Sequence, residues 1–307
     1  MPRPRKTLIC TSRTPFYHCV SRCVRRAFLC GKDRYTGKSY EHRRPWVEKR
    51  LLFLAGVFAV DLCAYAVMSN HTHVVLRINT EKARQWSNEQ ILRSWHKLHR
   101  GTLLTQRYLN DKSALTHNEL KTVQATIEVY RERLQCISWF MRELNEFIAR
   151  RANKEDECTC RFWEGRFKSQ ALLDEASVLA CMAYVDLNPA RTRKTHSIKN
   201  LLYTSLNQRL IAHKAGRSAR GLLPLRTQNK PDTFHLWFSL QTYLQLLHWS
   251  FEHYTNNIKD PPAGPAVPEL LEQTGLKVQD WMSVCYGFEQ QCKGEVSRNK
   301  WAAKACA

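Results

Sequence analysis

The chain has 307 residues, with 48 lysines and arginines against 27 acidic residues, and therefore a formal net charge of +21. A surplus of this size favours a polyanionic partner, most often nucleic acid and less often an anionic membrane surface. With 43% apolar and 24% charged residues, the composition is that of a globular protein and excludes a wholly disordered, collagen-like or coiled-coil chain.

The amino terminus does not have the pattern of a secretory signal. Its basic residues are not followed by a continuous apolar core with a small-residue cleavage site. The longest apolar tract, 51–68, carries Asp61 in its middle, where a charge in a membrane span would be costly. The 12 cysteines form no CxxC pair. We therefore expect a cytoplasmic protein with reduced thiols and no membrane partner.

The first part of the chain changes between strand and helix patterns. The predicted elements are a strand over 17–22, a helix over 44–58, and two strands over 62–68 and 71–77 that flank the turn residues Ser69 and Asn70. This order predicts a strand, a helix and then a β-hairpin.

The middle of the chain is mostly helical in pattern. The polar stretch 79–124 shows helical fragments but no motif, which predicts a helical insertion. Apolar residues then recur at spacings of three and four over 127–148, the pattern of one long amphipathic helix. A strand over 166–172 follows, and Asp174 is the expected N-cap of a helix that Pro189 should end.

Beyond residue 198 the periodic pattern weakens, and the proline-rich run 261–265 is typical of a linker. We therefore expect one domain over residues 10–197, which contains the insertion, and a C-terminal extension over 198–307. The sequence does not indicate what the extension does.

The predicted strand 71–77 carries two histidines that are separated by one residue. Because successive side chains of a strand point to opposite faces, His71 and His73 share one face, while Thr72, Val74 and Leu76 face the other and can be buried there. Two imidazoles placed in this way can bind one divalent metal ion. Such a pair is more often packed or exposed without a metal, and it gains weight from its position directly after a hairpin turn.

Tyr184 and Asn188 are four residues apart on a predicted helix and therefore lie on one face, one turn apart. A helical tyrosine usually only packs, and an Asn-Pro pair usually only ends a helix. A third signal precedes them at 161–169, where aromatic and cationic side chains alternate. That mixture suits stacking on bases and neutralising phosphates.

Four segments, in this order, resemble the REP-associated tyrosine transposases, which are relatives of the single-tyrosine HUH insertion-sequence transposases. The segments are Tyr17-His18-x-x-Ser21-Arg22, Ala64-Tyr65-Ala66-Val67-Met68-Ser69-Asn70-His71-Thr72-His73, Phe162-Trp163-Glu164-Gly165-Arg166-Phe167-Lys168-Ser169 and Tyr184-Val185-Asp186-Leu187-Asn188-Pro189-Ala190-Arg191. The resemblance covers about 10–80 and 135–195. It implies an α+β fold with a ferredoxin-like antiparallel sheet and packed helices, with which the predicted elements are compatible.

The resemblance also implies a mechanism of DNA cleavage and joining. His71, His73 and a third ligand at Asn188 would hold Mg²⁺ or Mn²⁺ against a phosphate of single-stranded or hairpin DNA. Tyr184 would attack the phosphorus and form a 5′-phosphotyrosine intermediate, which a later 3′-hydroxyl would resolve onto a new strand. An imidazole pair is also typical of zinc, so the identity of the metal stays open. The chain departs from the family at Thr72, where a bulky apolar residue is common.

Basic side chains near the predicted sheet are the candidates for DNA contact. Arg166 and Lys168 flank the strand that precedes the Tyr184 helix, and we expect them at backbone phosphates. Trp163 is a candidate for stacking on a base. A denser basic cluster near the first strand includes Arg22, Arg25 and Arg26.

Three other functions stay open at the level of the sequence. A protein of the same fold could bind folded repeats without cleaving them. A metal-dependent hydrolase could use zinc on the two histidines to activate water, with a merely structural Tyr184. An RNA-binding sheet with aromatic and basic residues would need no metal. The presence of both histidines, Tyr184 and Asn188 favours the transposase, and a homodimer is compatible with it.

Overall fold

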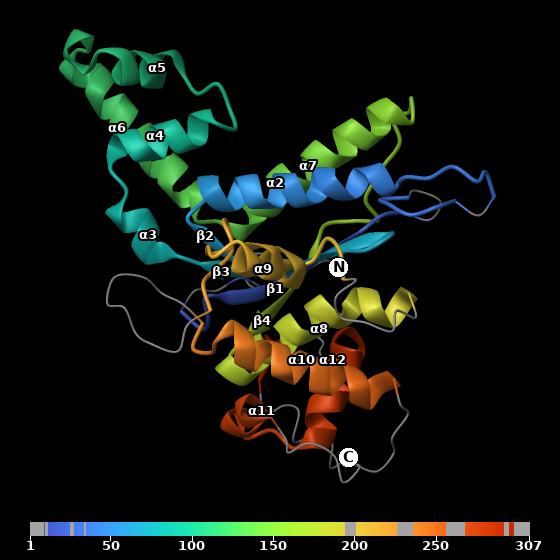
Figure 1. Cartoon of the computed structure of the whole chain (residues 1–307). Coiled ribbons are helices and arrows are strands. Elements are labelled where there is room, and N and C mark those ends of the chain that lie inside the picture. Colours follow the sequence, from blue (N-terminus) through green and yellow to red (C-terminus); the bar gives the residue numbers. More distant parts are fainter. Residues whose placement is uncertain are drawn as a thin grey trace.

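The computed structural model describes residues 9, 12–24, 28–33, 35–193, 201–225, 236–255, 268–291 and 295–297, of which 191–193, 254–255 and 289–291 are described by their backbone alone. The expected linker at 261–265 lies outside these residues. Within them the fold is mixed α+β, a sheet with helices packed on both faces (Figure 1), as the sequence predicted.

The sheet positions the residues of interest. Its strands are β1 (Phe16–Arg22), β2 (Val60–Val67), β3 (His71–Ile78), β4 (Lys168–Leu172) and β5 (Glu295–Val296). They lie in the order β2-β3-β1-β4-β5. Neighbouring strands are antiparallel, except that β5 is parallel to β4. With helices between β1 and β2 and between β3 and β4, the first four strands have the β-α-β-β-α-β order of ferredoxin-like folds.

Helices form a layer on each side of the sheet (Figure 1). One side carries α2 (Arg44–Val57), which follows the short η1 (Glu41–Arg43), and α7 (Ile137–Glu155). The other side carries α8 (Glu175–Arg193), α10 (Leu240–Thr255), α11 (Glu269–Thr274) and α12 (Val278–Gln291). A further helix, α9 (Ser205–Lys214), packs against β2.

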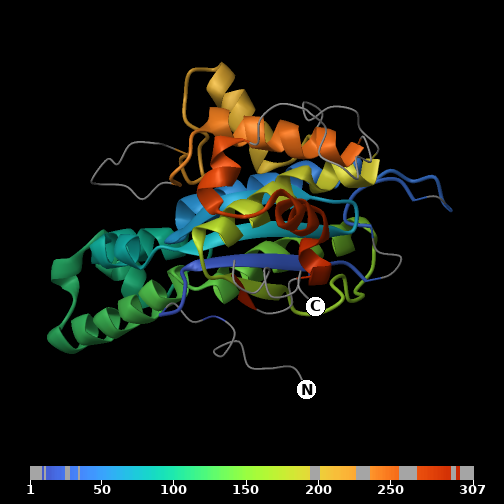
Figure 2. The same ribbon diagram turned by 90° about the horizontal axis from the view of Figure 1, so that it is seen from below.

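The insertion between β3 and α7 is helical, as predicted, and extends away from the sheet (Figure 2). It contains α3 (Thr80–Gln85), α4 (Asn88–His96), α5 (Leu103–Asn110), η2 (Lys112–Ala114) and α6 (His117–Leu134). Capping boxes at Ser87, Thr102 and Thr116 pair the N–H groups of the N-cap residue and of the third helical residue in α4, α5 and α6. Local sequence therefore defines where these helices begin.

The predicted long helix over 127–148 is two helices, α6 and α7. The chain leaves the helical conformation at Cys136, which is extended with φ −101° and ψ 117°. Ile127 and Leu134 before the break and Ile137 and Ile148 after it are all buried in one hydrophobic cluster. Because the apolar positions stay in phase on both sides, their periodicity does not reveal the break.

Helix α8 begins as predicted but does not end at Pro189. The backbone N–H of Ser177 donates to Asp174 Oδ1 at 2.8 Å, which is the expected N-cap bond. The helix then continues through Pro189 to Arg193. Every residue from 176 to 190 is buried. Packing against the sheet therefore outweighs the hydrogen bond that the proline lacks.

Two hydrophobic clusters fill the space on the two sides of the sheet. Val74 and Leu76 of β3 pack in the cluster that includes α2 and α7, whereas Val75 packs in the cluster that includes α8. This alternation agrees with the predicted faces of β3. The cysteines that the structure describes are free thiols, and no described helix combines the length and the apolar character needed to cross a membrane.

Candidate active site on the α8 face of the sheet

Strand register collects the polar residues of three strands on one face. Arg22 pairs with His71, Val20 pairs with both His73 and Lys168, and His18 pairs with Gln170. Because directly opposed residues of antiparallel strands point to the same side, these residues share the face that α8 covers.

The two predicted metal ligands on β3 lie next to each other. The ring centroids of His71 and His73 are 4.7 Å apart, with His73 fully buried and His71 partly exposed. Nδ1 of His71 lies 2.6 Å from Asn70 Oδ1. Burial, then the positive charge of Arg22 and the neighbouring His18, lower the pKa of His71 to about 4. His71 is therefore neutral at pH 7, the form that can bind a metal.

Helix α8 brings Tyr184 and Asn188 to the same place. Nδ2 of Asn188 lies 3.1 Å from Nε2 of His73, and the rings of Tyr184 and His73 meet edge to face with centroids 5.5 Å apart. Both α8 side chains are only 5% exposed. The spacing of four residues thus places the predicted nucleophile and the predicted third ligand against one histidine.

The structure adds His18 to this group, a residue for which the sequence indicated no role. Its Nε2 lies 3.0 Å from His73 Nδ1, and its Nδ1 lies 2.7 Å from Gln170 Oε1. The rings of His18 and His73 are stacked with centroids 5.2 Å apart. Burial lowers the pKa of His18 to about 4, partly opposed by the hydrogen bond to Gln170. Only the register of β1 with its two neighbours could have shown this contact.

Phe288 of α12 is the second residue that the sequence did not indicate. Its ring stacks on Tyr184 with centroids 5.5 Å apart and meets His18 edge to face at 5.6 Å. Phe288 lies in the part of the chain beyond residue 198, so this part contributes an aromatic side chain to the candidate site. No local pattern marks it, because its partners are far away in the sequence.

The predicted DNA-contacting residues are in different situations. Arg22 is exposed at the end of β1, Lys168 is exposed at the start of β4, and Arg166 is exposed just before β4. Trp163 is partly buried, and its indole N–H donates to the carbonyl oxygen of Asn145 on α7 at 2.8 Å. The predicted contacts Arg25 and Arg26 lie outside the described residues.

The donor set for a metal ion is small. Among the described residues, no group of three or more His, Cys, Asp and Glu side chains is arranged to hold a metal. The candidate set consists instead of two imidazoles and one amide. If these three groups alone held a metal ion, the charge of the ion would be balanced by the phosphate that it binds.

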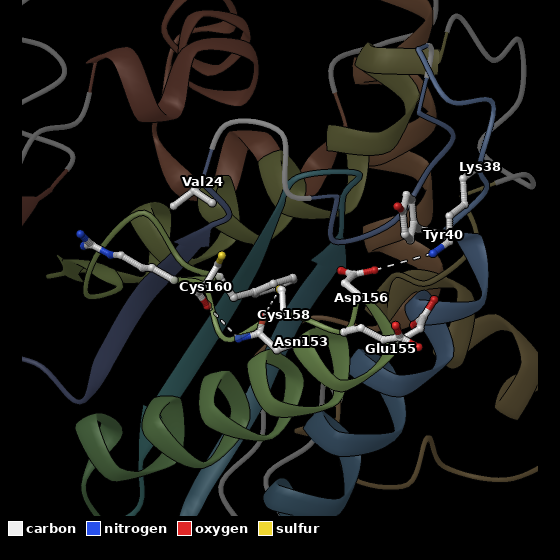
Figure 3. Close-up of a pocket in the computed structure, with 11 residues that line it drawn as sticks. Val24, Lys38, Tyr40, Asn153, Glu155, Asp156, Cys158 and Cys160 are labelled. Atoms are coloured by element: carbon white, nitrogen blue, oxygen red, sulfur yellow. Dashed lines mark hydrogen bonds and ion pairs between the residues drawn. The ribbon is translucent and has the colours of Figure 1, made fainter.

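A cavity of about 670 Å³ lies elsewhere, near the C-terminal end of α7 (Figure 3). Its lining consists of Val24, Lys38, Tyr40, Asn153, Glu155, Asp156, Glu157, Cys158, Cys160, Arg161 and Phe162. None of the predicted site residues is among them. Two of its carboxylates bind the fully buried Arg43, Glu155 at 3.0 Å and Asp156 at 2.5 Å. These acidic groups are already paired with a buried arginine. The candidate site is therefore the group of His71, His73, Tyr184 and Asn188 on the α8 face.

No protein-family model and no curated protein matches this chain. Among solved structures, the chain is similar to one described as a REP-associated tyrosine transposase bound to a REP hairpin, with 11% sequence identity and a TM-score of 0.38. The alignment covers 76% of this chain and 98% of that chain. At this identity and TM-score the likeness adds nothing to what the side chains described above support.

Proposed function

We propose that the protein is a metal-dependent tyrosine transposase that cleaves and rejoins single-stranded or hairpin DNA. One observation carries the proposal: the buried His73 of β3 contacts His71 on its own strand and both Tyr184 and Asn188 of α8. A tyrosine hydroxyl, two imidazoles and an amide are brought together there from two elements that are far apart in the chain. This combination fits nucleophilic attack on a metal-bound phosphate.

The two histidines are suited to hold Mg²⁺ or Mn²⁺ through their Nε2 atoms. Asn70 Oδ1 can only accept a hydrogen bond, so His71 donates from Nδ1 and its lone pair is on Nε2. Nε2 of His73 faces the Asn188 amide. Turning that amide over replaces its nitrogen by its oxygen, which would be the third ligand. A bound ion would polarise the phosphate and stabilise its developing charge.

Tyr184 supplies the nucleophile. Its Oη forms a bond to phosphorus while the bond from phosphorus to the 3′ oxygen breaks. The phenolic proton is released, and the departing 3′ oxygen takes up a proton to become a 3′-hydroxyl. Attack by a 3′-hydroxyl on the phosphotyrosine reverses these changes and restores a phosphodiester, without consuming an external energy source.

Exposed cations on the same face are suited to hold the DNA backbone. Arg22 lies at the end of β1, which pairs with β3, Lys168 lies at the start of β4 on the other side of β1, and Arg166 precedes β4. Their charges would position phosphates without reading the base sequence. The net charge of +21 adds attraction to DNA over a longer range.

The test is covalent capture of DNA. The full-length protein is incubated with labelled hairpin oligonucleotides, including the repeats that flank its gene, in Mg²⁺ or Mn²⁺. We expect a protein–DNA adduct that survives denaturation, is lost in Tyr184→Phe and is lost in chelator. Tyr108→Phe, which changes a tyrosine of α5 in the insertion, is the matched control and should keep the adduct.

The other outcomes separate the remaining functions. Cleavage that survives Tyr184→Phe would indicate a hydrolase that uses water. Tight DNA binding without cleavage over the whole panel would indicate a binding protein. Metal-independent preference for single-stranded RNA would indicate an RNA-binding sheet.

A further inference from the structure

His18 lies between two partners that leave it little freedom. It is fully buried, its Nδ1 is 2.7 Å from Gln170 Oε1, and its Nε2 is 3.0 Å from Nδ1 of His73. The ring also stacks on His73 and meets Tyr184 and Phe288 edge to face. These contacts fix both the position and the plane of the imidazole.

The hydrogen bonds have a direction that follows from the acceptor at one end. The carbonyl oxygen of Gln170 carries no proton, so His18 donates from Nδ1. A neutral His18 then has its lone pair on Nε2, where it accepts the Nδ1–H of His73. The lone pair of His73 is consequently on Nε2, where it accepts from Nδ2 of Asn188.

We propose that His18 is a positioning residue that keeps His73 in the Nδ1–H tautomer and so presents its Nε2 to a metal. The metal part of this proposal rests on the proposed function, whereas the tautomer is a property of the protein alone. Imidazoles that bind metals are typically oriented in this way, by a hydrogen bond from the second ring nitrogen.

The two candidate ligands are oriented by different means. His71 donates to Asn70, its neighbour in the chain and part of the exposed turn. His73 donates to His18, which is brought to it by the pairing of β1 with β3. We therefore expect loss of His18 to affect His73 and to leave the tautomer of His71 unchanged.

The tautomer is measured first, on metal-free full-length protein with ¹⁵N-labelled histidine. Nitrogen NMR shifts distinguish Nδ1–H from Nε2–H, and His73→Gln identifies the His73 signals among those of the 12 histidines. We expect His73 as Nδ1–H in the wild type and as a mixture in His18→Leu. A wild-type His73 that carries its proton on Nε2 would overturn the proposal.

Metal affinity is measured second, by electron paramagnetic resonance of Mn²⁺ titrated into protein without DNA. His18→Leu should weaken binding by about 10- to 100-fold, the usual effect of losing such a partner. His18→Gln, whose side-chain oxygen can accept the same hydrogen bond, should recover most of the affinity. Thr72→Val, next to both ligands but on the other face of the strand, should bind like the wild type.

These measurements separate the inference from the proposed function. Wild-type Mn²⁺ affinity in His18→Leu would overturn the positioning role even if DNA cleavage is observed. An Nδ1–H His73 that depends on His18, in a protein that binds no Mn²⁺, would support the tautomer assignment and contradict the metal-dependent function.

Discussion

Two neighbouring polar side chains of β3, His73 and Thr72, have different surroundings on the two faces of the sheet. On the α8 face, Gln170, His18, His73 and Asn188 are joined end to end by hydrogen bonds. On the α2 and α7 face, Oγ1 of Thr72 is buried without a hydrogen-bond partner among the described residues. Burying an unpaired polar group costs about 1–3 kcal/mol. Both ring nitrogens of His18 and of His73 have partners, so these two imidazoles avoid this cost.

The α2 and α7 face also has a buried charge, and its partners show a structural purpose. Arg43 is fully buried and contacts Glu155, Asp156 and the carbonyl oxygen of Phe28. Its guanidinium also lies over the ring of Tyr40 at 4.3 Å. These contacts tie the start of α2 to the end of α7. Arg43 therefore holds helices together, whereas His18 and His73 on the α8 face lie against the ring of Tyr184.

Removing the metal should have the largest effect on DNA cleavage, because the metal site is proposed on the α8 face. Chelator should abolish DNA cleavage because the phosphate loses its Lewis acid, and added Mn²⁺ should restore it. The free energy of unfolding should change little. Adduct yield and urea unfolding are measured in the same samples. Full cleavage in chelator would show that the histidines do not act through a metal.

Arg43→Ala should destabilise the other face strongly. The substitution leaves Glu155 and Asp156 without their buried partner, and breaking such a pair typically lowers the free energy of unfolding by about 3–5 kcal/mol. Urea unfolding measures this change. The matched control is Arg150→Ala on α7, whose exposed side chain pairs with Glu146 and should contribute less than about 1 kcal/mol. Equal effects of the two substitutions would contradict the structural role of Arg43.

Lys168→Ala should weaken DNA binding moderately. If Lys168 neutralises one phosphate, affinity falls for every sequence to a similar degree, and the slope of log affinity against log salt decreases in magnitude by about 1. Binding is measured by fluorescence anisotropy at several salt concentrations. Lys214→Ala, an exposed cation on α9, is the control. An unchanged slope in Lys168→Ala would place the DNA elsewhere.

Thr72→Val should have the smallest effect of these changes. Unlike Arg43→Ala, it should stabilise the protein. It removes the unpaired hydroxyl and keeps a β-branched side chain, so the free energy of unfolding should rise by about 1 kcal/mol while cleavage is unchanged. The comparison is Ser21→Ala, which removes the oxygen that accepts from Asn145 Nδ2 at 2.8 Å. That change should destabilise by about 1 kcal/mol. Destabilisation by Thr72→Val would mean that its hydroxyl is paired in solution.

The parts of the site that the sequence predicted depend on local periodicity. Alternation predicted that His71 and His73 share one face of their strand. The spacing of four residues predicted that Tyr184 and Asn188 share one face of their helix. The same local rules predicted the N-cap at Asp174. They failed at Cys136 and Pro189, where the conformation of one residue and the burial of a whole helix decide the outcome.

The parts of the site that the sequence did not predict depend on contacts between segments that are distant in the chain. His18 reaches His73 and Gln170 only because β1 lies between β3 and β4 in one particular register. Phe288 reaches Tyr184 because α12 packs on α8. Neither contact leaves a pattern within its own segment, so periodicity and spacing could not find it.

The most direct test of the proposed nucleophile is to locate the DNA on the protein. After reaction of a hairpin oligonucleotide with the protein and Mn²⁺, nuclease and protease digestion leaves a peptide whose mass and fragmentation identify the modified residue. We expect a nucleotide joined through its 5′ phosphate to Oη of Tyr184. Cleaved DNA with no modified peptide, or a nucleotide on any other residue, would contradict it.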